Sequence, residues 1–210
     1  MRFIEYDLFA EMLCMGEREK AGIFKPCCRT IRYSQITGAL RHKFNNKNLH
    51  AVGYLVKENG FNQIDYLIYS PHNRFVKISK VPLQVEFLRN VKGKIFIPIV
   101  ENEIAALLPS EFEILMGAML SKGFGLCKLC KVKEFEPPKK LKRGFLNTRL
   151  PEKYKELFGI RNVIKPVYGY LFEPDEQNPL TGNYILSLFE GSEVIAPDFL
   201  IEDKKEEKNG

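Results

Sequence analysis

The sequence predicts an α+β fold in which a β-α-β-β-α-β unit with inserted strands precedes a smaller, β-rich C-terminal part. Three observations lead to this prediction. Several segments, the first over residues 2–12, alternate apolar and polar side chains with the period of two that is typical of strands. Two segments start at a serine and continue with apolar residues at helical spacing. Glycines and prolines separate these segments.

The first half of the unit is expected to hold a strand, a helix and a hairpin. Residues 2–12 form the strand. Ser34 caps the helix. Residues 51–57 and 63–70 form the hairpin, because Asn59-Gly60 between them is a strong signal for a tight turn. The inward face of the helix is expected to consist of Ile36, Ala39, Leu40, Lys43 and Phe44.

The second half is expected to hold further strands over 74–100, with a turn at Gly93, then a helix and a last strand. Ser110 and Glu113 have the spacing of a capping box, so the helix begins there. Gly123 ends it and Gly125 opens the strand. The apolar helical face comprises Phe112, Leu115, Met116, Met119 and Leu120. This order of elements is the ferredoxin-like (RRM-like) pattern, which leaves one face of the sheet free to bind a ligand.

The domain boundary is expected near Pro137-Pro138, where prolines and lysines follow the last strand. Residues 1–136 then form the ferredoxin-like domain, 137–200 a β-rich subdomain, and 201–210 a charged, disordered tail. Within the subdomain we expect a short helix over 151–158 ended by Gly159, a strand over 163–172, and a hairpin of 184–189 and 193–196 around Gly191-Ser192.

Composition limits the function classes. The chain of 210 residues is 45% hydrophobic, yet no run of about 18 apolar residues occurs, so no membrane span and no membrane partner are expected. Its start carries acidic residues and does not resemble a signal peptide. Five cysteines, an odd number, fit reduced thiols in a cytoplasm better than a disulfide framework. No cofactor motif, Walker loop or Ser–His–Asp set stands out.

Cysteine spacing raises the question of a zinc site. Cys127 and Cys130 have CxxC spacing, and Cys27-Cys28 would complete four ligands. However, the pair falls in a predicted strand, where residues three apart point to opposite faces. Buried thiols are therefore expected in preference to a metal.

The net charge of +6 is unevenly distributed. Residues 29–48 carry five basic and no acidic side chains, and residues 126–149 carry eight basic and two acidic ones. Concentrated positive charge is typical of proteins that bind phosphate groups, including nucleic acids. The alternative is a pair of ordinary solvated faces.

A glycine-rich stretch carries a second signal for phosphate. Gly117 to Gly125 follow the pattern G-x5-G-x-G, with Ser121 and Lys122 before the last two glycines. Glycines let backbone N–H groups approach a phosphate closely, and the lysine adds charge. The alternative for Gly123 is a helix C-cap followed by a tight turn.

Two motifs resemble the RAMP superfamily of CRISPR-associated proteins. One is "LMGAMLSKGFG" (115–125), which is similar to the family's glycine-rich loop between the second helix and last strand, although Leu115 stands where its outer glycine is expected. The other is "RYSQITGALRHKF" (32–44), which resembles the first-helix motif through Ser34, Gly38, Ala39, Leu40 and Arg41. The resemblance implies a subunit that binds CRISPR RNA beside other CRISPR-associated subunits, most like the one that holds the 5′ handle.

Together, the resemblance and the charge pattern predict a set of RNA-binding residues in this chain. Lysines and arginines would neutralise phosphates, and glycine amides would contact them directly. Phe124 would stack on a base or, alternatively, lie in the core. The set comprises Arg29, Arg32, Ser34, Arg41, Lys43, Lys122, Gly123, Phe124, Gly125, Lys139, Lys140, Lys142 and Arg143.

Two alternatives remain open. A metal-independent endoribonuclease that processes CRISPR repeat RNA would use His42 as general acid or base, since a histidine titrates near neutrality, with Lys43 stabilising developing charge. A non-catalytic protein–protein adaptor would bind no RNA. Within the resemblance, the nearest rival is the backbone-filament subunit of type III complexes, whose target-cleaving members carry an aspartate on an early loop. Residues 14–33 contain Glu17 and Glu19 but no aspartate, so cleavage of a target RNA is not expected.

Overall fold

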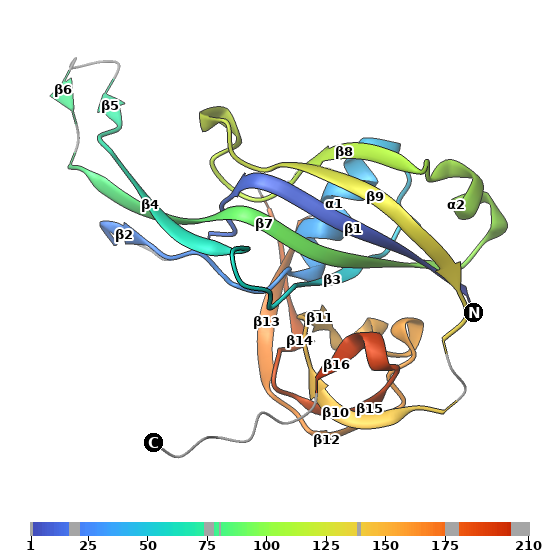
Figure 1. Ribbon diagram of the computed structural model, residues 1–210. Helices are drawn as coiled ribbons and strands as arrows, with labels where there is room; N and C mark the ends of the chain where they lie inside the picture. The colour runs from blue at the N-terminus through green and yellow to red at the C-terminus, as the bar shows by residue number, and fades with distance from the viewer. Residues whose placement is uncertain are drawn as a thin grey trace.

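The computed structural model describes residues 2–16, 22–73, 78–79, 81–137, 140–174 and 181–202. The described chain is an α+β fold rich in strands, as expected, with two α-helices. A long sheet forms one layer, and the C-terminal part lies below it in Figure 1. Phe199 of this part packs on Phe3 and Phe96, on the sheet face opposite the helices, so that face, which the sequence predicts to be free, is partly covered. No described helix is long and apolar enough to cross a membrane.

The main sheet is built around β1 (Arg2–Leu13), which lies between β7 (Leu83–Ile99) and β9 (Leu126–Phe135) and is antiparallel to both. Beyond β9 lies β8 (Glu111–Leu115). Two strands pair with β7 on its other edge, β3 (Val52–Leu55) and β4 (Gln63–Tyr69), both antiparallel. The short β2 (Phe24–Lys25) pairs in parallel with Gln84 and Val85 of β7, on the β1 side and beyond the end of β1. A small pair, β5 (His72–Asn73) and β6 (Ile78–Ser79), follows β4.

One face of this sheet packs on the two helices. Helix α1 (Tyr33–Phe44) connects β1 to β3 along the chain, and α2 (Asn102–Leu107) follows β7. Alternate residues of β1 point toward the helices, which is the strand period read from the sequence. The shared core includes Ile4, Tyr6, Leu8, Ile36, Leu40 and Ile104.

The C-terminal part consists of two small sheets. The first contains β10 (Lys142–Leu146), β12 (Asn162–Lys165), β15 (Glu193–Ala196) and β16 (Ile201–Glu202). The second contains β11 (Leu150–Pro151), β13 (Tyr168–Pro174) and β14 (Gly182–Leu188). The hydrophobic core of this C-terminal part also contains Phe3 of β1, Tyr33 of α1 and Phe96 of β7, so the C-terminal part packs against the main sheet and α1. A domain boundary at residue 137 stays a prediction.

The expected hairpin around Asn59-Gly60 is wrong. Gly60 does take a positive φ of 86°, but β3 and β4 pair with different stretches of β7 rather than with each other. The expected turn at Gly93 is also wrong, because β7 continues through Gly93 as one strand of 17 residues. A Cβ at Gly93 would lie 2.8 Å from the Tyr54 carbonyl oxygen, so glycine is needed there for close strand approach.

The expected helix from Ser110 is also wrong. Residues Glu111–Leu115 form β8, in which Phe112 and Ile114 are buried and their neighbours exposed. A short 3₁₀ turn over Leu120–Lys122 and the left-handed Gly123 follow. The second helix of the unit is instead α2, which lies upstream of β8.

Smaller corrections concern helix starts and the C-terminal part. The N-cap of α1 is Arg32, and Ser34 lies inside the helix.

The helix expected over 151–158 is two 3₁₀ turns, Glu152–Tyr154 and Glu156–Phe158, ended by the left-handed Gly159 as expected. The strand expected over 163–172 is split between β12 and β13. The hairpin expected around Gly191 does not form, because β14 and β15 belong to different sheets. Residues 201–202, expected to be disordered, form β16; the rest of that tail lies outside the described residues.

Candidate nucleic-acid interface

A groove of about 820 Å³ lies where the start of α1, the turn after β8 and the β13–β14 hairpin meet. Its charged lining residues are Lys25, Arg32 and Arg149, and none of its described lining residues is acidic. Its aromatic lining residues are Tyr69, Tyr170, Phe172, Tyr184 and Phe189. The groove therefore combines positive charge with aromatic rings, and we call it the α1 groove.

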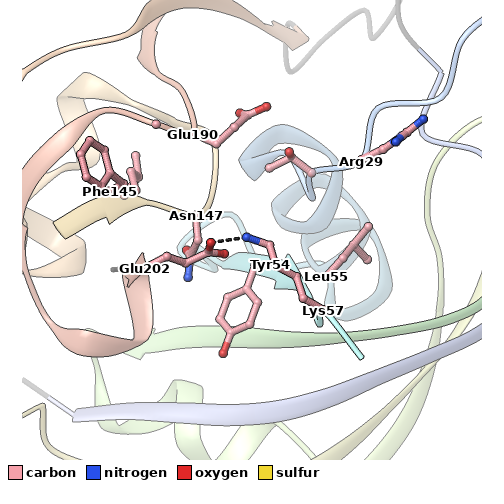
Figure 2. Close-up of a pocket in the computed structure, with 11 residues that line it drawn as sticks. Arg29, Tyr54, Leu55, Lys57, Phe145, Asn147, Glu190 and Glu202 are labelled. Carbon is pink, nitrogen blue, oxygen red and sulfur yellow. Dashed lines mark hydrogen bonds and ion pairs between the residues drawn. The ribbon is translucent and has the colours of Figure 1, made fainter. Parts of the chain in front are cut away.

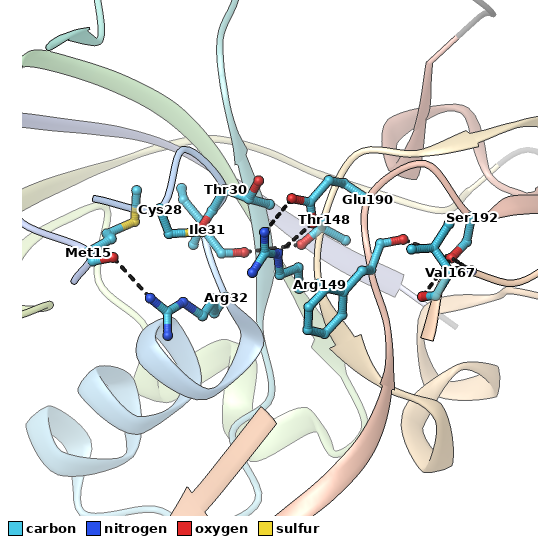
Figure 3. A network of polar contacts seen from close by, with 11 residues as sticks. Met15, Cys28, Thr30, Ile31, Arg32, Thr148, Arg149, Val167, Glu190 and Ser192 are labelled. Atoms are coloured by element: carbon cyan, nitrogen blue, oxygen red, sulfur yellow. Dashed lines mark hydrogen bonds and ion pairs between the residues drawn. The ribbon is translucent and has the colours of Figure 1, made fainter. Parts of the chain in front are cut away.

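Arg32 fixes the rim of the α1 groove. Its guanidinium donates hydrogen bonds to the carbonyl oxygens of Met15 (2.9 Å) and Gly16 (2.7 Å), as Figure 3 shows for Met15. These bonds tie the end of β1 to the start of α1. The backbones of Arg32 and Arg149 also form an isolated parallel β-bridge, in which the Tyr33 N–H donates to the Arg149 carbonyl oxygen at 2.9 Å. Arg32 thus has a structural role as well as a positive charge facing the groove.

Arg149 and Phe189 form the opposite wall, and Glu190, which does not line the groove, holds Arg149 in place (Figure 3 shows Arg149 and Glu190). Its guanidinium donates two hydrogen bonds to the Glu190 carboxylate, at 2.5 and 2.6 Å, and lies 4.4 Å from the centre of the Phe189 ring. Burial alone would raise the pKa of Glu190, but the hydrogen bonds from Arg149 outweigh it and the pKa is lowered. The bidentate pair holds this wall rigid.

A smaller hollow of about 250 Å³ continues along α1. It shares Ser34, Leu171 and Phe172 with the α1 groove. Arg41 and Lys47 add positive charge to its lining, and Glu173 adds one carboxylate. Two predicted site residues, Ser34 and Arg41, therefore lie beside Arg32 on one continuous surface.

The Nε of Arg41 donates to the Leu49 carbonyl oxygen at 2.8 Å, and its terminal nitrogen lies 3.5 Å from Nδ1 of His50. The hydroxyl of Tyr33 lies 2.5 Å from the same Nδ1. Burial, followed by the charge of Arg41, lowers the pKa of His50 to about 4, so the ring is neutral and accepts these bonds. His50 was missed by sequence reasoning because no motif surrounds it. His42, the predicted catalytic residue, is exposed on α1 beside the exposed Lys43.

The N–H groups of Gly123 and Gly125 are already bonded within the chain. The N–H of Gly123 donates to the Leu120 carbonyl oxygen at 3.1 Å, and that of Gly125 donates to the Met12 carbonyl oxygen at 2.9 Å. A Cβ at Gly125 would lie 2.2 Å from the Met116 carbonyl oxygen. Gly125 is therefore needed where the turn crosses β1 closely, and the amides of Gly123 and Gly125 are not the phosphate contacts that the sequence predicts.

Phe124 is buried, whereas Lys122 is exposed. Phe124 is 5% exposed and packs edge-to-face on Phe87 at 4.9 Å, so its predicted role in base stacking is wrong and the core alternative is correct. Lys122 is exposed, and its Nζ lies 5.6 Å from the centre of the Tyr69 ring, which lines the α1 groove.

The remaining predicted residues lie elsewhere. Arg29 lines a separate hollow of about 410 Å³ in which Lys57 pairs with Glu202 (Figure 2). On β10, Lys142 pairs with Asp198 at 2.8 Å and Arg143 with Glu193 at 2.5 Å. Lys140 is exposed, and Lys139 lies outside the described residues. The second predicted bank of charge is therefore partly neutralised by carboxylates.

The cysteines are free thiols. Cys127 is buried in β9, where burial raises its pKa to about 12, and Cys130 is partly exposed. Cys27 and Cys28 are buried in the core near the end of β1. Within the described ranges, no group of three or more His, Cys, Asp or Glu side chains is placed to hold a metal ion.

Comparison with known proteins informs the fold. No protein-family model matches the chain, and no curated protein does. Among solved structures, the fold is similar to a chain of the type III-B Cmr-beta bound to cognate target RNA and AMPPnP, state 1, with a TM-score of 0.58 and 11% identity. A second is the type III-B Cmr-beta bound to cognate target RNA, with a TM-score of 0.55 and 12% identity. Each alignment covers 93% of this chain and 86% of the other. At such identity the likeness concerns the fold.

Proposed function

We propose that this chain is a structural subunit of a CRISPR interference ribonucleoprotein that binds CRISPR RNA in the α1 groove. The similar chains belong to Cmr-beta structures that contain target RNA, which supports this class of function. The strand order β9-β1-β7-β3, with α1 between β1 and β3 and α2 between β7 and β9, supports a ferredoxin-like unit of the RAMP type. Other CRISPR-associated chains are the proposed protein partners.

The observation that carries the proposal is the charge of the α1 groove. Three cationic side chains line it, Lys122 lies beside it, and no carboxylate belongs to its described lining. Most acidic side chains elsewhere on the described surface sit next to a lysine or arginine, as in the pairs of Lys128 with Glu111 and Lys142 with Asp198. Arg149 is paired with Glu190 behind the wall, but the described lining itself is cationic and contains no carboxylate. Such a lining attracts a phosphate backbone and releases its counterions on binding.

The RNA-binding set is accordingly revised. Lys25 and Lys122 are proposed to neutralise phosphates at the α1 groove, and Arg41 and Lys47 to do so along the adjoining hollow. Ser34 is proposed to donate its hydroxyl to a phosphate or sugar oxygen. The exposed Lys43 is retained as a peripheral contact, and Arg29, Lys140, Lys142 and Arg143 as secondary ones.

The test is binding of labelled CRISPR repeat RNA by the full chain, in EDTA, over a range of salt concentrations. We expect intact, retarded RNA whose affinity falls steeply as salt rises. The double variant Lys25→Glu/Lys122→Glu is expected to weaken binding strongly, and neutral Lys→Gln versions to reduce the salt slope by about two. Lys165→Glu, at an exposed position of β12 outside the groove, is the matched control.

The alternatives give different results in the same assay. Cleavage at one fixed position that disappears in His42→Ala would assign a metal-independent endoribonuclease. Absence of any salt-dependent affinity would contradict the proposal and favour a protein–protein adaptor.

A further inference from the structure

The β13–β14 hairpin presents an aromatic face. In the antiparallel register, Tyr170 lies opposite Leu186 and Phe172 opposite Tyr184. Directly opposed residues share a face of the sheet, and alternate residues of one strand do so too. The same face therefore also carries Tyr168. These rings come from one short hairpin, not from scattered elements.

This face is open to solvent. Tyr170 is 64% exposed and Tyr184 is 61% exposed, and Tyr184 meets Phe172 edge-to-face at 5.6 Å. On the other face, Leu171 and Ser187 are buried. Isolated exposed apolar side chains are common, but a contiguous set of rings on one face is typical of a binding surface.

The surroundings of the rings point to the kind of ligand. Tyr170, Phe172 and Tyr184 line the α1 groove together with Lys25 and the arginines, and no described lining residue is acidic. A lining of rings and cations that contains no acidic residue fits nucleic acid, whose bases stack while its phosphates pair with lysine. A docking protein would be expected to meet an apolar centre with a rim of both charges.

The wall behind the rings is rigid. Gly169 has no Cβ, and one built there would lie 2.3 Å from the Phe189 ring, so this ring packs directly on the backbone of β13. Phe189 in turn lies under the Arg149 guanidinium, which Glu190 holds through two hydrogen bonds. A pre-organised platform loses little entropy when a ligand stacks on it.

We infer that the exposed face of the β13–β14 hairpin is a base-stacking platform, and that the α1 groove takes single-stranded RNA with unpaired bases. This inference rests on the proposed RNA-binding function and adds its substrate class. Tyr170 and Tyr184 stack on successive bases, and Lys25 and Lys122 follow the backbone. Because every base has an aromatic face, binding is tolerant of sequence. Because duplex bases are already stacked on each other, a duplex gains nothing from the platform.

The experiment compares three ligands, a single-stranded RNA of mixed sequence, the same sequence as a duplex, and the single strand with abasic sites, at one salt concentration. Tyr170→Ala and Tyr184→Ala are each expected to weaken single-strand binding by about 5- to 150-fold. The duplex and the abasic strand are expected to bind the wild type and these variants equally. Tyr→Phe at either position restores stacking, and the salt slope stays unchanged because no cation is removed.

The control is Tyr66→Ala, which removes a tyrosine of similar exposure (50%) from β4, outside the α1 groove. Circular dichroism of each variant verifies the fold. Wild-type affinity that depends on salt but not on Tyr170 or Tyr184 would overturn the platform and leave the proposed function standing. No RNA binding by the wild type would overturn both. Loss of binding to a partner chain, with RNA affinity intact, would overturn the inference and assign the face to protein contact.

Discussion

Replacing Gly125 by alanine tests whether the glycine-rich stretch is a structural crossing or a phosphate-binding loop. Gly125 has a φ of +82°, which costs an alanine about 1–2 kcal/mol. The new Cβ would also lie 2.2 Å from the Met116 carbonyl oxygen, so the turn must open. Opening it breaks the Gly125 N–H bond to Met12 and the Met116 N–H bond to the Gly125 carbonyl, both 2.9 Å long and worth about 1 kcal/mol each. We expect a loss of about 3–4 kcal/mol in the free energy of unfolding.

Gly123→Ala is the matched control. Gly123 has a similar φ of +86°, but a Cβ there meets no atom within 4 Å, so the expected loss is about 1 kcal/mol. Urea denaturation gives the two free energies of unfolding, and RNA affinity is measured below the transition. Equal, small losses of stability for the two variants, with RNA binding abolished in both, would refute the structural interpretation. A phosphate-binding loop would give that result.

Two further predictions concern partly buried polar groups. Because burial lowers the pKa of His50 to about 4, the unfolded chain binds more protons between pH 6.5 and 4, so the free energy of unfolding falls as pH drops through this range. Allowing for the partial exposure of His50, we expect the free energy of unfolding, measured by urea denaturation at a series of pH values, to fall by about 2 kcal/mol over this range. The pH profile of His50→Asn should be flatter, and parallel profiles of the two proteins would contradict this prediction. Arg149→Lys removes the bidentate pairing with Glu190 and the stacking on Phe189, so thermal denaturation should show a loss of about 1–2 kcal/mol in the free energy of unfolding. Arg89→Lys, in an ion pair with Asp65 in which both side chains are exposed, should change it by less than about 0.5 kcal/mol. Equal effects of the two substitutions would show that the wall is not rigid.

Residues 111–115 illustrate how local patterns mislead. A serine followed three residues later by a glutamate fits a capping box, and Phe112, Leu115 and Met116 fit a helical face. The same residues alternate as Glu111, Phe112, Glu113 and Ile114, which fits a strand. Over five residues the two periods cannot be separated, and the decision came from β9, whose free edge pairs with β8.

The glycine motif shows a similar division. Its sequence correctly indicated positions with a backbone conformation that favours glycine, since Gly117, Gly123 and Gly125 all have positive φ. The sequence did not reveal what fills the space beside them. At Gly117 and Gly125 it is a backbone carbonyl group of the chain itself rather than a phosphate, and such contacts between distant segments leave no local signal.

The proposed binding surface was partly predictable. Arg32, Ser34 and Arg41 belong to one helix motif, and they lie at the N-cap, in the first turn and in the last turn of α1. Lys25 and Tyr170 are separated from that motif along the chain and were not predicted. They join it because β2 pairs with β7 and because β13 packs beside α1.

The sequence by itself determined the α+β class, the strands β1 and β9, the helix α1 and the uneven distribution of charge. These properties depend on residues a few positions apart, and their periodicity states which face each element buries. The tertiary structure alone decided which strands pair, which lysines meet a carboxylate, and that tyrosines of the C-terminal part line a groove beside the first helix. Those outcomes depend on hydrogen bonds and packing between segments distant in the sequence, in places more than a hundred residues apart, which no local pattern encodes.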